Sequence, residues 1–387
     1  MKKKIIISGG GTGGHIFPAI SIANAIKDKY PDTEILFVGA QGKMEMDRVP
    51  LAGYKIIGLP VAGLKRSLSL SNLKLPFMVV KSIYKARKII KEFNPDCAVG
   101  VGGYASAPLV WSAAKLGVPC LIQEQNSYAG LTNKIVGKYA KKICVAYSGM
   151  DRFFPSDKIL YTGNPIRKEI LSLYENRITN NGNGNNKVYK ELRAESYEYF
   201  KLDKKKKTVF VVGGSLGCGT FNRIMKTWIK EKAKSVNYQI LWQSGKAYKN
   251  NIETFKESLD GNIPSNIKNL SFVNRMDLAF TAADIIVSRA GAGSISELCC
   301  IGKPCIFVPS PVVAEDHQTH NAESLANKNA ALMIKDSEAD VKLIRVIENL
   351  LDNNKLMESL SDNIITLAKP DAADIIAIEI MKLADIK

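Results

Sequence analysis

The sequence predicts an α/β protein of two domains, each with a parallel β-sheet covered by helices on both faces. Three observations lead to this prediction. The chain has 387 residues, more than the roughly 100–200 residues of one domain. Short apolar runs rich in valine and isoleucine alternate with helical patterns along most of the chain. The alternation restarts near residue 208, and in both halves the first strand leads into a glycine-rich turn.

The expected strands are short and rich in β-branched residues, which is typical of strands buried on both faces of a parallel sheet. In the first half they are residues 4–8, 34–39, 54–59, 97–100, 120–123, 142–146 and 159–162. In the second half they are residues 208–212, 238–243, 270–273, 285–288, 305–308 and 331–334. Open parallel sheets bind ligands at the carboxyl ends of their strands, so we expect function in the loops at these ends.

The domain boundaries follow from the break in this alternation. Residues 1–166 are predicted to form an N-terminal α/β domain, and residues 208–370 a C-terminal one. Residues 167–207 contain a polar, asparagine- and lysine-rich insertion, so we interpret them as a linker. Residues 371–387 are predicted to form a helix that packs back toward the N-terminal domain.

The composition limits the class of protein. The net charge is +17, and no acidic residue occurs between Asp47 and Glu92, which predicts an anionic partner for the first half: nucleic acid, an anionic membrane or a phosphorylated substrate. No apolar run approaches the roughly 20 residues of a membrane-spanning helix, and the N-terminus lacks a secretory apolar region. The seven cysteines fall mostly in apolar runs, which indicates buried thiols, and no zinc motif is present.

The stretch SGGGTGGH at residues 8–15 is expected to join the first strand to a helix whose backbone N–H groups face an anion. It also contains a dinucleotide-binding GxGxxG pattern, but the second expected strand lacks the acid that would hold a ribose, which disfavours NAD. His15 ends the stretch. An imidazole with an ordinary pKa of about 6.5 is well suited to remove a proton there, although a structural helix-start histidine is the simpler alternative.

Three further strand ends carry glycines or polar groups. They are GVGGYAS at residues 100–106, QEQN at 123–126 and VVGGSLG at 211–217. Each of the first two could merely cap the following helix, but together with the stretch at 8–15 they make three such strand ends in the first half, which favours a ligand site. The stretch at 211–217 predicts a second anion-binding helix N-terminus, in the C-terminal half.

The stretch SRAGAGSISEL at residues 288–298 combines glycines that leave backbone N–H groups open with Glu297 one turn further on. A nucleoside diphosphate fits both features, the phosphates at the N–H groups and the ribose hydroxyls at the carboxylate. The alternative is a capping box formed by Ser294 and Glu297. The cluster EDHQTHN at residues 315–321 gives only a weak indication of metal binding.

Seven motifs, GGGTGGHIFPA, GVGGYASAP, QEQNSYAGLTNK, TGNPIR, VVGGSLG, SRAGAGSISE and EDHQTHNA, occur in an order and spacing that resemble the MurG family. These are the UDP-N-acetylglucosamine:N-acetylmuramyl-(pentapeptide) pyrophosphoryl-undecaprenol N-acetylglucosamine transferases of glycosyltransferase family 28. The resemblance covers nearly the whole chain. It implies a GT-B fold, with two Rossmann-like domains facing each other across a cleft. It also implies inverting transfer of N-acetylglucosamine to the 4-hydroxyl of lipid I, which yields lipid II and UDP in peptidoglycan synthesis.

The resemblance also implies roles for individual residues. His15 is the implied catalytic base. The implied donor-binding residues are Thr12, Gly13, Gly14, Asn126, Arg167, Ser215, Val273, Ala292, Gly293, Ser294, Glu297 and Gln318. The implied acceptor-binding residues are Gly102, Gly103, Tyr104 and Asn133. No cofactor or metal is implied. The chain departs from the family pattern at Leu216 and Cys218, where glutamine and alanine are usual, and in the insertion at 181–186.

The basic, acid-free span includes a segment that mixes large apolar groups with lysines. By pattern alone it is either an ordinary helix or one that lies on an anionic membrane surface. The residues assigned to this surface are Leu73, Leu75, Phe77, Val80, Lys81, Tyr84 and Lys85. The resemblance places the protein on the cytoplasmic side of the cell membrane as a peripheral protein, with UDP-N-acetylglucosamine, lipid I, the anionic inner-membrane surface and proteins of cell-wall synthesis or division as partners.

Three other functions fit part of the sequence. A sugar-nucleotide epimerase, or another GT-B enzyme that uses a UDP sugar, could share this fold. An NAD oxidoreductase would need the ribose-binding acid that is missing. A nucleic-acid-binding protein would account for the positive charge, but the basic span contains no recognisable RNA- or DNA-binding module, so no nucleic-acid partner is expected.

Overall fold

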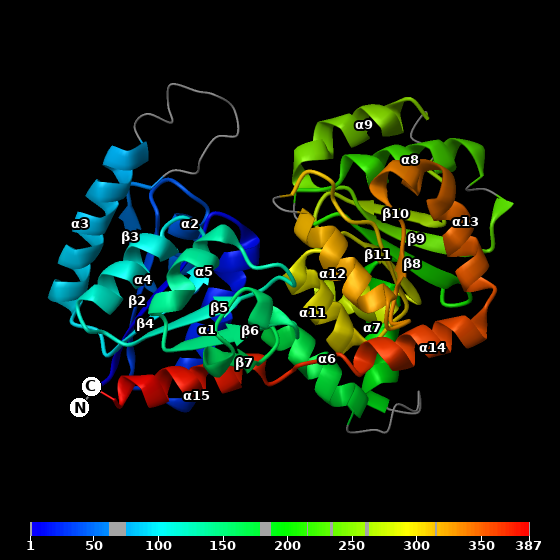
Figure 1. Ribbon diagram of the computed structural model, residues 1–387. Helices are drawn as coiled ribbons and strands as arrows, with labels where there is room; N and C mark the ends of the chain where they lie inside the picture. The colour runs from blue at the N-terminus through cyan, green and yellow to red at the C-terminus, as the bar shows by residue number, and fades with distance from the viewer. Residues whose placement is uncertain are drawn as a thin grey trace. The chain divides into compact units, whose positions relative to one another are not determined.

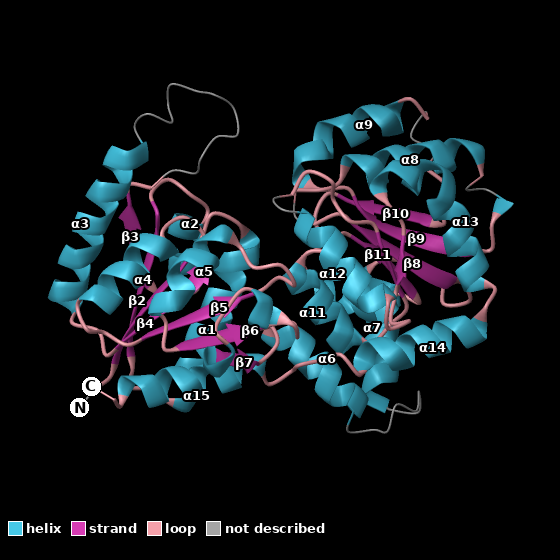
Figure 2. Ribbon diagram, in the orientation of Figure 1, coloured by secondary structure: helices cyan, strands magenta, loops and turns pink. Residues whose placement is uncertain are grey.

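A computed structural model describes residues 2–61, 75–178, 187–214, 216–232, 235–259, 263–313 and 316–386. The chain forms two compact units. Unit 1 comprises Met1–Arg167 together with Lys369–Lys387, and unit 2 comprises Lys168–Ala368. Each unit contains a parallel sheet with helices on its faces (Figures 1 and 2), so the predicted α/β class with two Rossmann-like sheets is confirmed.

The sheet of unit 1 has the strand order β3-β2-β1-β4-β5-β6-β7, and all neighbouring strands are parallel. Its strands are β1 (Lys4–Gly9), β2 (Glu34–Ala40), β3 (Lys55–Leu59), β4 (Cys97–Gly102), β5 (Cys120–Glu124), β6 (Lys142–Val145) and β7 (Ile159–Tyr161). Its helices are α1 (Gly13–Lys29), α2 (Glu45–Leu51), α3 (Leu75–Phe93), α4 (Ser106–Lys115), α5 (Leu131–Val136) and α15 (Ala372–Ala384). The strand order reverses direction between β1 and β4, and this switch point is where such sheets bind ligands.

Alternation along β1 explains the two cores of unit 1. Ile5 and Ile7 pack on the face covered by α1 and α15, whereas Ile6 packs on the opposite face with residues of α3 and α4. Helix α15, drawn in red in Figure 1, lies against α1, where Ile376 and Ile380 are fully buried. Helix α15 is therefore part of the core of unit 1.

The sheet of unit 2 repeats this plan with the order β10-β9-β8-β11-β12-β13, again all parallel, and it reverses between β8 and β11. Its strands are β8 (Lys207–Val212), β9 (Tyr238–Gln243), β10 (Ile267–Leu270), β11 (Ile285–Ser288), β12 (Cys305–Phe307) and β13 (Leu332–Met333). Its helices are α6 (Lys168–Ile178), α7 (Lys187–Tyr199), α8 (Gly219–Glu231), α9 (Lys249–Glu257), α10 (Met276–Ala282), α11 (Ala292–Ile301), α12 (His317–Ala326), α13 (Ala339–Leu351) and α14 (Asn354–Ile365).

One strand is displaced from its expected position. The sequence predicts a strand at 270–273, but β10 ends at Leu270. The N–H of Val273 donates instead to the side chain of Gln243 at 3.0 Å, so this residue belongs to a loop held by a side chain. Local apolar content could not reveal that partner.

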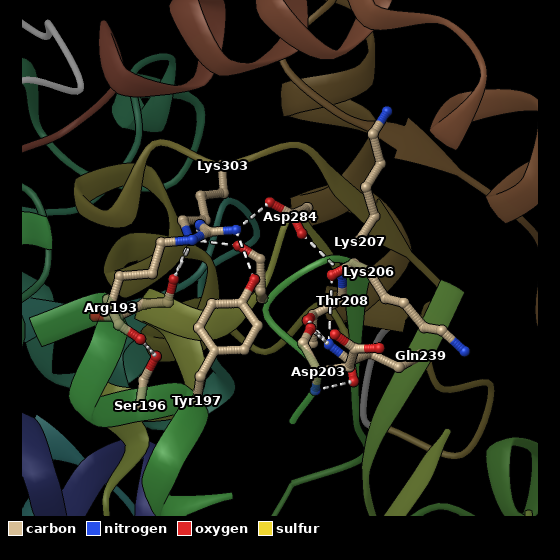
Figure 3. Close-up of polar contacts among 12 residues, drawn as sticks. Arg193, Ser196, Tyr197, Asp203, Lys206, Lys207, Thr208, Gln239, Asp284 and Lys303 are labelled. Carbon is tan, nitrogen blue, oxygen red and sulfur yellow. Dashed lines mark hydrogen bonds and ion pairs between the residues drawn. The ribbon is translucent and has the colours of Figure 1, made fainter. Parts of the chain in front are cut away.

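The stretch 167–207, expected to be a linker, contains two helices that pack within unit 2. On α6, Arg177 donates to the carbonyls of Ile301 and Gly302 at 2.8 and 2.7 Å. On α7, Arg193 pairs with Asp284 at 2.7 Å, as Figure 3 shows. These partners lie about a hundred residues away along the chain, so they could not be predicted from the polar composition of residues 167–207. The asparagine-rich insertion at 181–186 lies outside the described residues.

The polar cluster of Figure 3 supports the amino-terminal edge of the second sheet. Burial lowers the pKa of Lys303, whose ammonium donates to the carbonyls of Thr281, at 2.7 Å, and Ala283. Burial by itself would lower the pKa of Arg193, but the carboxylate of Asp284 raises it overall. Asp284 also accepts from the N–H of Thr208 at 2.7 Å. The cluster lies at the starts of β8 and β11, the ends away from the glycine loops.

All seven cysteines are buried and free, as the sequence indicates. Burial raises the pKa of Cys120 and of Cys144 to about 12, so these thiols are poor nucleophiles in the folded protein. Among the described residues, no helix is long and apolar enough to span a bilayer.

Candidate active site

Two glycine loops meet at the switch point of unit 1. One follows β1 and the other ends β4, and the N–H of Gly10 donates to the carbonyl of Gly102 at 3.3 Å. Gly103 has a φ of +87°, and a Cβ there would lie 2.2 Å from the carbonyl oxygen of Gly10. Only glycine therefore permits this approach at position 103.

His15 lies in the first turn of α1, directly beside these loops. A Cβ at Gly102 would lie 2.8 Å from both Nδ1 and Cε1 of the imidazole. The Nδ1 atom lies 2.9 Å from Oε1 of Gln125, a buried residue that follows β5. Glycine at 102 thus makes room for the ring, and the carboxyl ends of three strands contribute to its surroundings.

The N-terminus of α1 is suited to an anion. Its N-cap residue, Thr12, has extended backbone and makes no capping hydrogen bond with its side chain, and the first turn carries no acidic residue. Such a helix start presents the positive end of the helix dipole. Thr12 and Gly14 are exposed there. Tyr104 is 49% exposed, and its ring lies 4.0 Å from where a Cβ on Gly11 would be.

A buried carboxylate below the first loop was not expected from the sequence. Glu45, at the start of α2, is fully buried and accepts from the N–H groups of Gly11 and Ala40 at 2.9 and 2.8 Å. A Cβ on Gly10 would lie 2.1 Å from its Oε1. The N–H of Gly11 therefore already donates a hydrogen bond within the protein. In the sequence, Glu45 looks like an ordinary acid at a helix start.

A second buried carboxylate organises the loop after β5. Glu124 accepts from the backbone N–H groups of Asn126 and Gly130, both at 3.0 Å, and from Nδ2 of Asn133 at 2.9 Å. Asn133, expected to bind the acceptor, is itself buried with 2% of its surface exposed. Its amide therefore braces Glu124 in this structure. Arg167 is half-buried at the end of the first segment of unit 1.

In unit 2, two glycine turns, one after β8 and one after β9, contact each other at the carboxyl edge of the sheet. A Cβ on Gly217 would lie 2.2 Å from the carbonyl oxygen of Ser244, and one on Gly245 would lie 2.2 Å from the Cα of Gly217. Gln243 joins two loops, because its Nε2 donates to the carbonyl of Gly214 at 2.9 Å while its Oε1 accepts from Val273. Ser215 lies outside the described residues.

The interpretation of Ser294 and Glu297 as a capping box is wrong. The N-cap of α11 is Gly291, which has no side chain to form a cap, so Ser294 already lies inside the helix. The first turn carries no acidic residue, and a Cβ on Gly293 would meet nothing within 4 Å. Gly293 and Glu297 are four residues apart and therefore share one face of α11. The helix start is open to an anion, with a carboxylate one turn further on.

The side chains of Gln318 and Arg289 both form hydrogen bonds within unit 2. Oε1 of Gln318 accepts from the N–H groups of Ala290 and Ser310, at 3.2 and 2.9 Å, so its Nε2 points away from these two N–H groups. The guanidinium of Arg289 pairs with Asp336 at 2.6 Å and donates to two carbonyls, so its charge is neutralised within unit 2. Among the described residues, no cluster of three potential metal ligands occurs.

Comparison with known proteins identifies the family. The glycosyltransferase family 28 N-terminal domain matches residues 5–145, and its C-terminal domain matches residues 208–376. A UDP-N-acetylglucosamine–N-acetylmuramyl-(pentapeptide) pyrophosphoryl-undecaprenol N-acetylglucosamine transferase from Parabacteroides distasonis is 50% identical over 386 residues, covering 100% of both chains. A protein of the same name from Phocaeicola vulgatus is 52% identical, covering 99% of this chain and 96% of its own. The chain belongs to glycosyltransferase family 28.

Solved structures agree with membership of family 28. MurG from Acinetobacter baumannii has 26% identity and a TM-score of 0.74, covering 98% of this chain and 99% of its own. UDP-GlcNAc 2-epimerase from Neisseria meningitidis, bound to UDP-GlcNAc, has a TM-score of 0.65 over 99% of this chain and 100% of its own. At 13% identity, the epimerase shows only that the fold is shared. The predicted GT-B class is confirmed.

The fold brings the expected family 28 residues into two groups, one in each unit. In unit 1, the residues that gather at the switch point are Thr12, Gly13, Gly14, His15, Gly102, Gly103 and Tyr104. In unit 2, those on loops and helix starts beyond the strand ends are Val273, Ala292, Gly293, Ser294, Glu297 and Gln318. Sequence reasoning missed Glu45 and Gln243, which hold these loops in place.

We expect replacement of Gly103 by alanine to destabilise unit 1 more than the same replacement at Gly53. Both glycines have nearly equal φ values, +87° and +86°, but a Cβ on Gly53 meets nothing within 4 Å. Gly53→Ala should cost about 1–2 kcal/mol from the positive φ alone. Gly103→Ala should cost about 1–3 kcal/mol more, because the new methyl group collides with Gly10. Urea unfolding measures both losses, and equal losses would contradict the close contact.

Proposed function

We propose that this protein transfers N-acetylglucosamine from UDP-N-acetylglucosamine to the 4-hydroxyl of the N-acetylmuramyl group of lipid I, forming lipid II and UDP in peptidoglycan synthesis. The observation that carries the proposal is the full-length identity of about half to proteins that bear this enzyme name. The two open helix starts are consistent with a donor and an acceptor that both carry a diphosphate. The epimerase alternative has only a likeness of fold in its favour.

Unit 2 is the proposed donor site. The start of α11 holds the diphosphate at its backbone N–H groups, and Glu297 accepts the ribose hydroxyls. The N–H of Val273 is already bonded to Gln243, so the carbonyl of Val273 is the backbone group left for uracil. Nε2 of Gln318 donates to a sugar hydroxyl, because its Oε1 is occupied by two backbone N–H groups.

Unit 1 is the proposed acceptor site and supplies the base. His15 removes the proton of the acceptor hydroxyl as the hydroxyl oxygen attacks the anomeric carbon, and the bond to UDP breaks with inversion. The helix start at Thr12 to Gly14, together with Arg167, stabilises phosphate charge. Gly102, Gly103 and Tyr104 surround the acceptor diphosphate.

The test is transfer of labelled N-acetylglucosamine to a lipid I analogue, with UDP release measured in parallel. Wild-type protein should label the lipid and release UDP only when lipid I is present, whereas lipid-independent conversion of the sugar nucleotide would indicate an epimerase. His15→Ala should lower kcat by about 10²–10⁴-fold, the usual contribution of a general base. Near-normal turnover with an unchanged pH profile in that variant would remove His15 from this role.

We expect Gly293→Ala to weaken donor binding while it leaves the fold intact. The position is helical and open, so alanine should stabilise α11 by up to about 1 kcal/mol. The added methyl group would block the approach of the diphosphate and raise KM for UDP-N-acetylglucosamine by about 10–100-fold. The KM for the lipid acceptor serves as the internal control. An unchanged KM for UDP-N-acetylglucosamine would show that the diphosphate does not bind at the start of α11.

Helix α3 is the proposed membrane contact on the cytoplasmic side. Phe77, Val80 and Tyr84 are 74%, 66% and 74% exposed, and their spacing places them on one face of the helix, with Lys81 also exposed. Exposed aromatic and apolar groups beside lysines suit an anionic lipid surface. Lys85, expected on this surface, donates instead to the carbonyl of Gly58 at 2.7 Å. Leu73 and the side chain of Leu75 lie outside the described residues.

Liposome sedimentation tests this contact. Vesicles with anionic lipid should bind the wild-type protein, and replacing Phe77, Val80 and Tyr84 together by serine should weaken binding by about 10³-fold or more, since each loses roughly 1.5–3 kcal/mol of burial. The matched control is Val341→Ser on α13 of unit 2, which is 81% exposed and should leave binding unchanged. Equal binding by the triple variant would exclude this face.

A further inference from the structure

A chain of buried amides leads from the interior of unit 1 to the imidazole of His15. It consists of Asn164, Gln123 and Gln125, which are buried to at least 98%. Buried amides need partners for both their oxygen and their nitrogen, and each amide can satisfy its neighbour in only one orientation. The direction of the hydrogen bond that ends on His15 can therefore be derived from the backbone carbonyls that the chain contacts.

Two independent sets of contacts give the same orientation for Gln125. Its Nε2 lies 2.8 Å from the carbonyl oxygen of Val101 and 3.1 Å from that of Gln123. Carbonyl oxygens only accept, so the atom that faces them must be the NH₂ group. In the opposite orientation, the amide oxygen of Gln125 would face two carbonyl oxygens in a buried site, and its NH₂ group would have lost both acceptors.

The other two amides lead to the same result. Nδ2 of Asn164 donates to the carbonyl of Gln125 at 3.0 Å, so Oδ1 of Asn164 accepts, from Nε2 of Gln123 at 2.9 Å. Oε1 of Gln123 then accepts from Nε2 of Gln125. The remaining atom of the chain, Oε1 of Gln125, is an acceptor that lies 2.9 Å from Nδ1 of His15. A ring nitrogen at that distance from an acceptor must carry the hydrogen.

We propose that Gln125 is a positioning residue that holds His15 in its Nδ1–H tautomer, with its orientation set by Val101, Gln123 and Asn164. The neutral ring then has its lone pair on Nε2, the nitrogen that takes the proton of the acceptor hydroxyl. After that transfer, Nδ1–H remains donated to Gln125. Because the partner is a neutral amide, it orients the ring without adding a negative charge. The inference rests on the proposed role of His15 as the base.

The tautomer can be measured without substrate. Two-bond ¹H–¹⁵N correlation spectra of protein labelled at histidine ring nitrogens distinguish Nδ1–H from Nε2–H, and the chain has only three histidines. The signals that disappear from the spectrum of the His15→Gln variant are those of the His15 ring. At about pH 8.5, well above the ordinary pKa of histidine, we expect His15 of the wild-type protein to be in the Nδ1–H form. The Nε2–H form in the wild-type protein would overturn the proposal even if Gln125→Leu failed to fold.

Gln125→Leu tests the consequence for catalysis. Without its acceptor, His15 should populate the Nε2–H form, and kcat should fall by about 10–100-fold, the range found when the partner of a metal-bound imidazole is removed. The KM for both substrates should change by less than about threefold. Unchanged kcat, or a tautomer that stays Nδ1–H, would overturn the proposal.

Gln239→Leu is the matched control. Gln239 is also buried to 99%, and its amide contacts Asp203 and Thr208 in unit 2, at the edge of the sheet away from the glycine loops. The Gln239→Leu variant should lose stability as the Gln125→Leu variant does, but it should keep the Nδ1–H tautomer of His15 and the wild-type kcat. Equal loss of kcat in the two variants would assign Gln125 a merely structural role. Transfer by the wild-type protein tests the proposed function separately, because the tautomer is read without turnover.

Discussion

The contact between the glycine loops after β1 and β4 is the constraint on which the candidate site of unit 1 depends. The two backbones touch because positions 102 and 103 lack side chains and have positive φ. This contact brings the start of α1, the ring of His15 and Tyr104 to one edge of the sheet. Unit 2 contains a similar close contact between two glycine backbones, those of Gly217 and Gly245. In unit 1 this packing of glycine against backbone accompanies the open start of α1, whereas the open helix start of unit 2 is that of α11, after Gly291.

Several polar side chains that look functional are used to hold these loops. Glu45 and Glu124 are buried carboxylates whose hydrogen-bond donors are backbone N–H and amide groups. Arg289 carries its charge next to the proposed donor site, yet Asp336 neutralises it. Buried polar groups without partners are costly, so these interactions make the loops rigid. The proposed anion sites then rely on backbone N–H groups and helix dipoles, which are fixed by the fold.

Much of the fold could be predicted because its signals are local. The strands are short runs of valine and isoleucine, and the glycine motifs follow them directly, so both can be recognised within a few residues. The stretch 167–207 could not be assigned in this way, because α6 and α7 depend on partners such as Ile301 and Asp284. The alternative of a capping box at Ser294 and Glu297 also rested on a local pattern, and it is wrong because the helix already begins after Gly291.

The sequence by itself determined the parallel α/β class, the glycine loops at the strand ends, the candidate residues and the resemblance to family 28. These depend on residue type and spacing along the chain. Only the tertiary structure decided which polar atoms remain for a ligand. It uses the N–H groups of Gly11 and Val273 internally, buries Asn133 and orients Gln125 toward His15. The physical reason is that a hydrogen-bond partner is chosen by proximity in space, and the partners of Gly11, Val273 and His15 lie between 30 and 110 residues away in the chain.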